Sequence, residues 1–357
     1  MKPLTLLIKP VAGLCNMNCK YCFYKKASEN RENSVMTRET ADLLVHRIKE
    51  YQPSYLNLIF QGGEPTLAGL AFYEYFTAKI KKNIKTNVYY SIQTNGLLVD
   101  SGFADFFHKN GFLVGVSLDG GRKTNDRYRL DKNGNSVLPQ VLTAINTLKK
   151  YNVPFNILSV VDDENASDVD STYAYFKKHG FSDLQFIPFV DECEGVSLSS
   201  GAYEEFLKRL FDLWYDDFTP DDFIRIRHMN NYLDIIAGFP PENCAMCGFC
   251  GSYYVVEANG DIYPCDFYCK EEYKLGNLSD GNPFELTEKQ RKFVKESFII
   301  QQTCKECKYY RLCRGGCKRD RTDGFTKNKY CRAYYNFFEY SLDRMDEAVK
   351  RLKEYSV

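Results

Sequence analysis

Short apolar runs alternate with amphipathic segments along the first half of the chain. The runs are rich in Val, Ile, Leu and Phe without strict alternation, which is typical of strands covered on both faces. Six strands are predicted, at residues 4–9, 55–60, 87–92, 112–118, 153–160 and 184–189. The amphipathic segments predict helices near residues 37–50, 69–82, 101–109, 138–150 and 166–179. Six alternations of strand and helix predict an α/β fold with a parallel sheet, in the form of a partial (β/α)6 TIM-like barrel.

The second half of the chain has a different pattern. Residues 199–238 have an apolar stripe at helical spacing, in which Trp214 is expected to be core. Residues 252–264 predict a hairpin with a turn around Asn259 and Gly260. Residues 332–355 predict a final helix with a charged face.

Polar and small residues follow each of the first four predicted strands. Because the carboxyl ends of parallel strands form one rim, where ligands of such folds gather, these residues are expected to lie together. They are Cys15, Cys19 and Cys22, then Gly62, Gly63 and Glu64, then Gln93, Thr94 and Asn95, and finally Ser117 and Asp119.

The cysteines are unevenly distributed, and this is the clearest domain signal. Of the 14 cysteines, three lie before residue 23, Cys193 stands alone, and ten lie between residues 244 and 331. We therefore predict two domains, residues 1–235 with the barrel and connecting helices and residues 236–357 with the cysteine-rich region and the last helix. Without an export signal, clustered cysteines indicate metal or cluster ligands, with disulfides as the alternative.

The charge and hydropathy exclude several kinds of partner. Lys plus Arg and Asp plus Glu are both 47, so the net charge is zero, which argues against duplex DNA or an anionic membrane as a partner. The chain shows no signal peptide and no run of about 18 apolar residues. A cytoplasmic location is expected.

Cys15, Cys19 and Cys22 form a C-x3-C-x2-C pattern followed by aromatic residues. A structural zinc site takes four protein ligands, and iron–sulfur clusters are normally held by four thiolates. Three thiolates leave one iron of a 4Fe–4S cluster open to a small molecule. A zinc knuckle with a distant fourth ligand is the alternative.

This loop resembles that of the radical S-adenosylmethionine (radical SAM) enzymes. In that family the open iron binds the amino and carboxylate groups of SAM, and one electron cleaves SAM to methionine and a 5′-deoxyadenosyl radical. The segment QGGEPTLAG (61–69) resembles the family's GGEP motif, whose backbone edge binds the SAM amino group. Two glycines permit close approach of the backbone, and Glu64 adds negative charge near a cation.

The resemblance also implies residues that contact SAM: Tyr21, Gly63, Ser117, Arg129 and Leu184. Arg129 would pair with the SAM carboxylate, and a surface arginine is the alternative. Tyr21 and Leu184 would flank the adenosine, and core packing is the alternative for both.

The C-terminal cysteines hold enough thiolates for two further clusters, with two zinc ions as the alternative. The segment CKECKYYRLCRGGC (304–317) resembles the SPASM domain, which carries auxiliary 4Fe–4S clusters. Within that class the chain resembles the anaerobic sulfatase-maturating enzymes, from PLTLLIKP to YCRAY. The resemblance implies three 4Fe–4S clusters, with the first auxiliary cluster on Cys244, Cys250, Cys265 and Cys317. It implies the second on Cys304, Cys307, Cys313 and Cys331.

Three cysteines have no assigned role in this family pattern. Cys247 lies in a natural ligand run and is an alternative to Cys244 or Cys250. Cys193 and Cys269 are expected to be buried thiols.

The family converts a Cys or Ser of a type I sulfatase to Cα-formylglycine. The radical removes a Cβ hydrogen, a base removes the side-chain proton, and one further electron leaves. Asp266, directly after Cys265 in YPCDFY, matches the catalytic aspartate, with a turn-stabilising role as the alternative. Carboxylates are weak bases at neutral pH unless burial or nearby negative charge favours protonation.

Histidine is the more usual base, but only four histidines exist. His46, His108 and His179 fall in predicted helices outside the barrel. His228 lies near the domain junction, where a solvated role is expected.

The resemblance implies an unfolded sulfatase as substrate, a flavodoxin or ferredoxin as electron donor, and neither nucleic acid nor membrane as partner. A monomer is expected. One rival is a SPASM maturase that makes thioether or carbon–carbon crosslinks in a ribosomal peptide. Such enzymes often have an N-terminal leader-binding domain, for which a first strand at residue 4 leaves no room. A zinc-rich scaffold is the rival of another class.

Overall fold

The computed structural model describes residues 2–24, 34–190, 195–322, 324 and 326–355. The chain divides into two compact units, each formed by segments that are distant in sequence. Unit 1 comprises Met1–Ser117, Arg129–Phe155 and Gly251–Phe293. Unit 2 comprises Leu118–Tyr128, Asn156–Cys250 and Val294–Val357.

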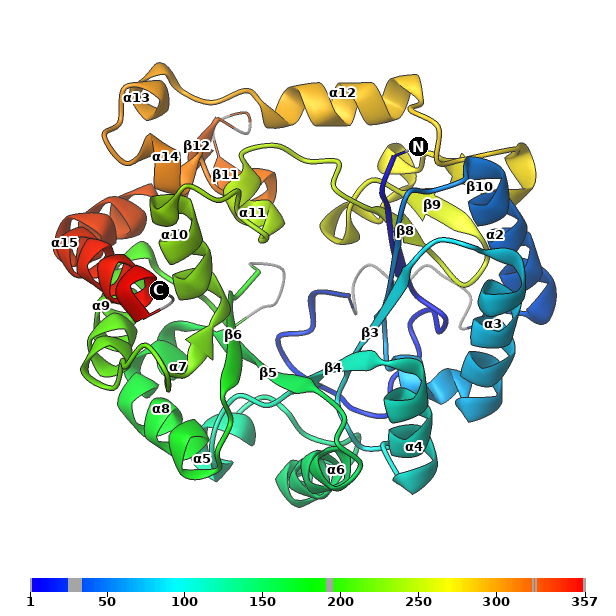
Figure 1. Cartoon of the computed structure of the whole chain (residues 1–357), viewed down its shortest axis with the longest axis horizontal. Coiled ribbons are helices and arrows are strands. Elements are labelled where there is room, and N and C mark those ends of the chain that lie inside the picture. The colour runs from blue at the N-terminus through cyan, green and yellow to red at the C-terminus, as the bar shows by residue number, and fades with distance from the viewer. Residues whose placement is uncertain (1, 25–33, 191–194, 323, 325, 356–357) are drawn as a thin grey trace. The chain divides into compact units, whose positions relative to one another are not determined.

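Four parallel strands form the centre of unit 1. They are β1 (Leu4–Ile8), β2 (Leu56–Phe60), β3 (Val88–Thr94) and β4 (Phe112–Ser117), adjacent in that order. The register pairs Ile8 with Phe60 and Thr94 with Val116, so the carboxyl ends of the four strands share one edge. Figure 1 shows the helices that alternate with them: α2 (Arg38–Tyr51), α3 (Leu70–Asn83), α4 (Ser101–Asn110) and α6 (Leu138–Lys150).

Local sequence signals set the limits of these helices. Thr37 caps α2 by accepting a hydrogen bond from the Thr40 amide, and Asp100 caps α4 by accepting one from the Phe103 amide. Gly111 ends α4 in the left-handed conformation that glycine adopts at no steric cost. Aromatic side chains, among them Phe60 and Phe112 with nearly parallel rings 6.0 Å apart, fill the interior of unit 1.

The C-terminal part of the sequence contributes three further strands to unit 1. β8 (Tyr254–Val256) pairs in parallel with β1, β9 (Asp261–Tyr263) returns antiparallel to β8, and β10 (Gly276–Asn277) pairs with β9. Short 3-10 turns lie between β9 and β10, at Asp266–Tyr268 and Glu271–Tyr273, and directly after β10, at Leu278–Asp280. The predicted hairpin at residues 252–264 is confirmed, and its pairing with β1 could not be derived from local pattern.

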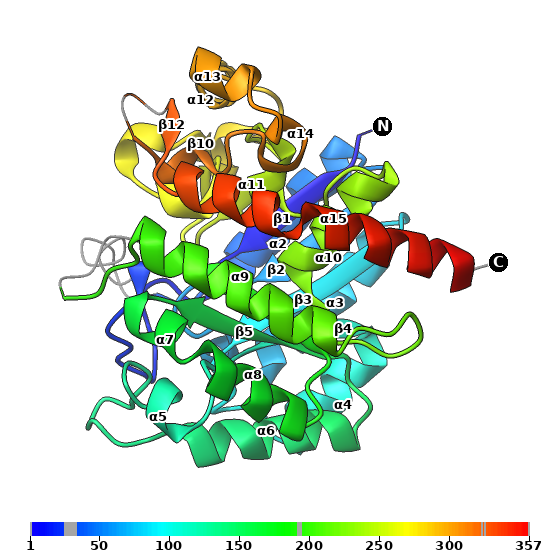
Figure 2. The ribbon, with the colours of Figure 1, turned by 90° about the vertical axis from the view of Figure 1, so that its left-hand side faces the viewer.

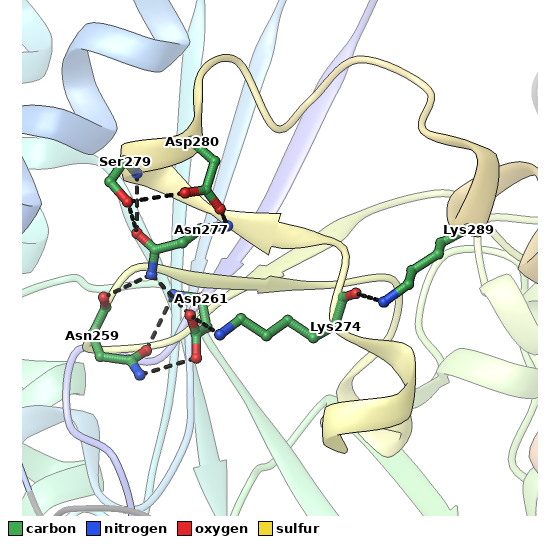
Figure 3. Close-up of polar contacts among 7 residues, drawn as sticks. All are labelled: Asn259, Asp261, Lys274, Asn277, Ser279, Asp280 and Lys289. Carbon is green, nitrogen blue, oxygen red and sulfur yellow. Dashed lines mark hydrogen bonds and ion pairs between the residues drawn. The ribbon is translucent and has the colours of Figure 1, made fainter.

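Polar contacts around Asp261 hold this hairpin in shape (Figure 3). Its carboxylate pairs with Lys274 at 2.8 Å and accepts hydrogen bonds from the side-chain amides of Asn277 and Asn259 at 2.8 and 3.0 Å. Burial works to raise the pKa of Asp261, but these three partners outweigh it and lower the pKa. The network therefore fixes the strand that leads directly to Cys265 and Asp266.

Unit 2 contains the last parallel strands, β5 (Phe155–Val161), β6 (Asp183–Pro188) and β7 (Arg225–Ile226), adjacent in that order. Its helices are α5 (Arg122–Asn125), α7 (Asp163–Ser167), α8 (Val169–Lys178), α9 (Ser200–Asp216), α10 (Arg227–Ala237) and α15 (Cys331–Tyr355). Figure 2 shows α9 and α15 side by side, and the two helices pack on each other. Trp214 of α9 is buried and donates its indole N–H to the carbonyl of Ile224, which confirms its core role.

The cysteine-rich part of unit 2 consists of short elements. They are α11 (Cys244–Cys247), α13 (Gln302–Lys305), α14 (Tyr310–Cys313), a 3-10 turn at Lys318–Asp320, β11 (Arg321–Thr322) and β12 (Lys327–Asn328). α12 (Glu288–Ser297) joins the two units in sequence.

The six predicted strands and the α/β class are confirmed, with small differences at the strand ends. Residues 199–238 are not continuously helical, because β7 separates α9 from α10, and the predicted helix at 166–179 is part of two helices, α7 and α8. The boundary predicted between residues 235 and 236 stays a prediction. None of the described helices is both long and apolar enough to span a bilayer.

Candidate functional site

The three-cysteine loop lies at the carboxyl edge of the unit 1 strands, directly after β1. The Met17 amide donates to the Cys15 thiol at 3.4 Å, and the Cys22 amide donates to the Cys19 carbonyl at 3.4 Å. Burial, together with the nearby Glu64 and Cys22, raises the pKa of the Cys15 thiol. Such a loop gathers thiols in a place where positive metal charge would favour their thiolate form.

The two glycines of the GGEP segment are required by this loop. A Cβ atom on Gly63 would lie 2.0 Å from the carbonyl oxygen of Leu14, which no adjustment of a flexible side chain relieves. The Glu64 amide donates to the same oxygen at 2.9 Å. Gly62 has a φ of +127°, a conformation that L-residues rarely adopt. The segment is thus fastened by its backbone against the cysteine loop.

Glu64 is 1% exposed, and both oxygens of its carboxylate accept hydrogen bonds from groups of the protein. One oxygen accepts from the Thr66 amide and from the hydroxyls of Thr66 and Thr94, and the other accepts from the Asn95 amide at 2.8 Å. Burial raises the pKa of Glu64, and these donors act against that rise. Glu64 thereby fastens the segments of the rim to one another, and the expectation that it adds negative charge near a bound cation stays a prediction.

Asn95 connects Glu64 to the cysteine loop. Its side-chain amide donates to the Asn16 side chain at 2.7 Å and lies 3.9 Å from the Cys15 sulfur. The segments after β1, β2 and β3 are therefore connected through hydrogen bonds in unit 1. This part of the expected rim is confirmed, whereas Asp119 belongs to unit 2, where it accepts from the Val160 amide.

Arg129 is buried, so the alternative of a surface arginine is wrong. Its guanidinium donates to the Tyr21 hydroxyl at 3.0 Å and lies 3.9 Å from the Met17 sulfur, which places it against the cysteine loop. Ser117 ends β4 at the same edge of the sheet. Contact of Tyr21, Gly63, Ser117 and Arg129 with SAM stays a prediction.

Leu184 lies at the amino end of β6, where it is buried. Four residues separate it from the carboxyl end of that strand, or roughly 13 Å at the rise of an extended chain. Its position fits the alternative of core packing, and contact with the adenosine stays a prediction.

Four cysteines gather in unit 2 around Cys313. Burial and the thiols of Cys331, Cys304 and Cys307 raise the pKa of Cys313 to about 12, and the backbone N–H of Gly315 acts against that rise. Burial and the thiols of Cys304 and Cys307 likewise raise the pKa of Cys331. The structure brings together the four side chains predicted for the second auxiliary cluster.

A second group in unit 2 contains Cys244, Cys250 and Cys317. Burial, then Cys317, Cys250 and Cys247, raises the pKa of Cys244 to about 12, and burial and Cys317 raise the pKa of Cys250 to about 11. The Cys247 sulfur instead lies 3.6 Å from the carbonyl oxygen of Asn243 and 3.8 Å from that of Pro241. Because Cys247 also acts on Cys244, the choice of Cys244 and Cys250 over Cys247 as ligands stays a prediction. Cys265 belongs to unit 1.

The donor set fits clusters of several irons. Within the described ranges, no three His, Cys, Asp or Glu side chains form a group suited to hold one metal ion. Thiolates of a 4Fe–4S cube each bind a different iron, so they need not converge on one point. No disulfide joins the thirteen cysteines that the structure describes, and Cys193 lies outside the described residues.

Asp266 is 6% exposed and lies at the start of the turn after β9. Its Oδ1 atom forms an ion pair with Lys9 Nζ at 2.7 Å. The Tyr253 hydroxyl lies 3.3 Å from the Cys265 sulfur and accepts from the Asp266 amide at 3.3 Å. The rings of Phe23 and Phe267 are 4.8 Å apart, so the cysteine loop and the segment of Asp266 are in contact within unit 1.

The histidines offer no better base. His46 and His108 are exposed on helices, as expected, and His179 lies directly after α8 instead of within the predicted helix. The solvated role expected for His228 is wrong, because its Nε2 atom is enclosed and has no hydrogen-bond partner among the described residues. Burial lowers the pKa of His228 to about 4, so the ring is neutral near pH 7.

Two important residues had no predicted role. Lys9 is the last residue of the first predicted strand, and Asn95 is among the residues that follow the third. A lysine at the end of an apolar strand is itself a signal, since burial of an ammonium requires nearby partners. Cys269 is buried, as predicted for an unassigned thiol.

Comparisons with known proteins agree with this geometry. The family model of the radical SAM superfamily matches residues 10–176. The cysteine-type anaerobic sulfatase-maturating enzyme of Clostridium novyi is 39% identical over 99% of both chains. The serine-type enzyme of Bacteroides thetaiotaomicron is 34% identical over 98% of this chain and 92% of its own.

A solved structure, native anSMEcpe with bound AdoMet and Cp18Cys peptide, has a TM-score of 0.93 at 39% identity. The likeness covers 98% of this chain and 99% of that one. It confirms the α/β radical SAM fold with a cysteine-rich C-terminal region, as predicted.

Proposed function

The chain belongs to the anaerobic sulfatase-maturating enzymes of the radical SAM superfamily, and on this premise we propose that it oxidises a cysteine of an unfolded sulfatase to Cα-formylglycine. The observation that carries the proposal is that unit 1 contains three features together. It holds the three-cysteine loop, the glycine edge fastened to it, and a buried aspartate on a segment that touches the loop. The zinc-scaffold reading is wrong, since the chain is an enzyme of this family.

The residues present fit the cofactors of the family. Cys15, Cys19 and Cys22 would hold the cluster that binds SAM, with Gly63, Arg129, Ser117 and Tyr21 around SAM. The quartet of Cys304, Cys307, Cys313 and Cys331 would hold one auxiliary cluster, and Cys244, Cys250, Cys265 and Cys317 the other. When bound, SAM supplies a 5′-deoxyadenosyl radical, which abstracts a hydrogen atom.

The reaction assigns a separate task to Asp266. Oxidation of the cysteine removes one Cβ hydrogen atom, the thiol proton and one electron, which leaves a thioaldehyde that takes up water and releases sulfide. Asp266 would accept the thiol proton, because it is a carboxylate enclosed next to an expected cluster ligand. The two cysteine quartets of the C-terminal region would hold the auxiliary clusters, which would supply an acceptor for the electron.

Cysteine is the proposed target because the 39% identical relative is cysteine-type, whereas the serine-type relative is 34% identical. We also propose that a flavodoxin or ferredoxin is the electron donor, as expected for the family. A monomeric state and a cytoplasmic location are proposed as well.

The test is anaerobic incubation of the reconstituted enzyme with SAM, dithionite and matched sulfatase peptides containing Cys or Ser. We expect the mass change from thiol to aldehyde in the Cys peptide, together with 5′-deoxyadenosine. Cleavage of SAM without formylglycine in either peptide would overturn the proposal, and a crosslinked product would support the rival peptide maturase.

A further inference from the structure

We propose that Lys9 is the positioning residue for Asp266: its buried ammonium holds one carboxylate oxygen, so that the other is presented to the substrate. The inference rests on the proposed function, since it concerns how the aspartate of the maturation reaction is held. It is carried by the surroundings of Lys9 within unit 1.

Lys9 is buried in a way that demands charged partners. It follows the last residue of β1 and is 0% exposed, and its amide donates to the Val256 carbonyl of β8 at 2.8 Å. An ammonium without partners would cost several kcal/mol to bury. The strand pairing therefore fixes the backbone, and the partners of the ammonium must lie within reach of one side chain.

Four groups surround the ammonium. Asp266 Oδ1 lies at 2.7 Å, Glu257 Oε1 at 3.9 Å and the Cys269 sulfur at 3.7 Å from Nζ, and the ring centroid of Tyr24 is 3.6 Å away. Burial acts to lower the pKa of Lys9, but Asp266 and then the other three raise it well above its usual value. The side chain is thus an ammonium in contact with an aromatic face and two carboxylates.

The two carboxylates are not equivalent. Glu257 has a second partner, since its Oε2 atom accepts from the Tyr24 hydroxyl at 2.7 Å. Lys9 is the cation that contacts Asp266, and the contact is with its Oδ1 atom at 2.7 Å. This asymmetry indicates that Glu257 and Tyr24 hold Lys9, and that Lys9 in turn holds Asp266.

The GGEP segment also makes room for this lysine. A Cβ atom on Gly62 would lie 3.1 Å from Lys9 Cβ and 3.3 Å from its Cγ. Adjacent glycines of one motif therefore serve two neighbouring sites, with Gly63 against the cysteine loop and Gly62 beside the stem of Lys9. The base and the SAM site are thereby placed by the same turn after β2.

The test compares formylglycine with 5′-deoxyadenosine in the variant Lys9→Met. Displacement of a reacting group by about 1 Å can cost on the order of 100-fold in rate, so we expect formylglycine to fall by about 10- to 100-fold. SAM cleavage is expected to stay within about threefold, because the cysteine loop is untouched. With a peptide deuterated at Cβ, deuterium should still appear in 5′-deoxyadenosine. Equal losses of both products would overturn the proposal.

A double-mutant cycle with Asp266→Asn separates positioning from a general structural role. If Lys9 acts through Asp266, Lys9→Met should lower the residual formylglycine by less than about threefold in the Asp266→Asn background. The same fold-loss in both backgrounds would overturn the proposal. Lys79→Met, which removes a lysine paired with Asp42 on a helix of unit 1, is the matched control and should leave the product ratio unchanged.

Lys9→Met leaves two buried carboxylates, so folding is checked by iron content and thermal melting. Lys9→Met/Glu257→Gln removes one cation and one anion together and keeps the net charge. If the single variant does not fold, this double variant is assayed, and wild-type formylglycine yield in it would overturn the proposal. Failure of the proposed function itself would appear differently, as SAM cleavage without formylglycine in the wild-type enzyme.

Discussion

The two regions expected to hold clusters are built on different principles. In unit 1 the cysteine loop lies at the end of regular parallel strands and is fastened by hydrogen bonds among Leu14, Glu64 and Asn95. In unit 2 most of the cysteines lie on helices of about one turn, such as α11 and α14, or on turns, and Cys331 begins the long helix α15. The first region is held by regular strands and the Glu64 network, whereas the second has short elements tied together by buried Arg321, which donates to the carbonyls of Gly315, Gly316 and Ser297. We therefore expect loss of metal from the cysteine loop of unit 1 to abolish the reaction without unfolding that unit. We expect loss of metal from the cysteine-rich part of unit 2 to lower the local stability of that part.

The comparison predicts that loss of one cysteine in unit 1 abolishes chemistry without unfolding the chain. In Cys19→Ala we expect no SAM cleavage, because the cluster loses one of its three protein ligands. The melting temperature should remain close to that of the wild type, since strands and the Glu64 network do not depend on this thiol. The measurements are 5′-deoxyadenosine by chromatography and thermal melting, and iron should fall by about four per chain.

The matched change in unit 2 is Cys313→Ala, which removes the thiol at the centre of its quartet. Here we expect both lower melting temperature and loss of formylglycine, because the short elements lose a common attachment point. Equal melting temperatures of Cys19→Ala and Cys313→Ala would contradict the proposed difference between the two regions.

The proposed base, Asp266, lies in unit 1 but belongs to the C-terminal part of the sequence. Its substitution therefore tests whether proton removal can be lost while the SAM chemistry expected for the cysteine loop is kept. Asp266→Asn keeps the size of the side chain and removes the proton acceptor. We expect SAM cleavage to continue and formylglycine formation to fall by about 100-fold or more, the usual contribution of a positioned base. Product yields measured from one reaction give both values. Near-normal formylglycine would remove Asp266 from the reaction.

Removal of iron should separate the two regions directly. We expect faster amide exchange in 244–250 and 304–317 after anaerobic chelation, because these segments have few long elements to protect them. The amides of β1 to β3 should change little, since their ladder and the Glu64 contacts remain. Hydrogen exchange read by mass spectrometry checks both expectations. Uniform loss of protection would show that the strands of unit 1 also depend on the clusters.

The sequence predicted features that depend on neighbouring residues, and it did not predict contacts between segments that are distant in sequence. The apolar runs predicted all six strands, and the spacing of the first three cysteines predicted that they form one ligand set. Each of these signals is contained in a short stretch of the chain. Apart from Tyr24, the partners of Lys9 come from β8, from Glu257 directly after it and from the segment after β9, more than 200 residues away, so no local pattern could assign them. The enclosure of His228 and the orientation of Cys247 likewise depend on packing in three dimensions.

Glu64 shows the same limit within a recognised motif. Its place in GGEP suggested a role toward a cation, yet its oxygens accept hydrogen bonds from residues after β2 and β3. A motif identifies which residues matter, whereas the role of each side chain follows from the donors that fold around it.

The smallest expected effect concerns the glycine that fastens the SAM edge. Gly63→Ala would place a methyl group 2.0 Å from the Leu14 carbonyl oxygen, so the backbone must shift, at a cost of about 1–3 kcal/mol. Gly201 is the matched control in unit 2, because it lies in α9 with no atom within 4 Å of an added Cβ. Gly201→Ala should be neutral or stabilise by up to about 1 kcal/mol, since alanine favours a helix. Denaturant melts of both variants, with SAM affinity measured alongside, test this contrast. If the two substitutions have equal effects on stability and on SAM affinity, the close approach of Gly63 to the cysteine loop does not organise the site.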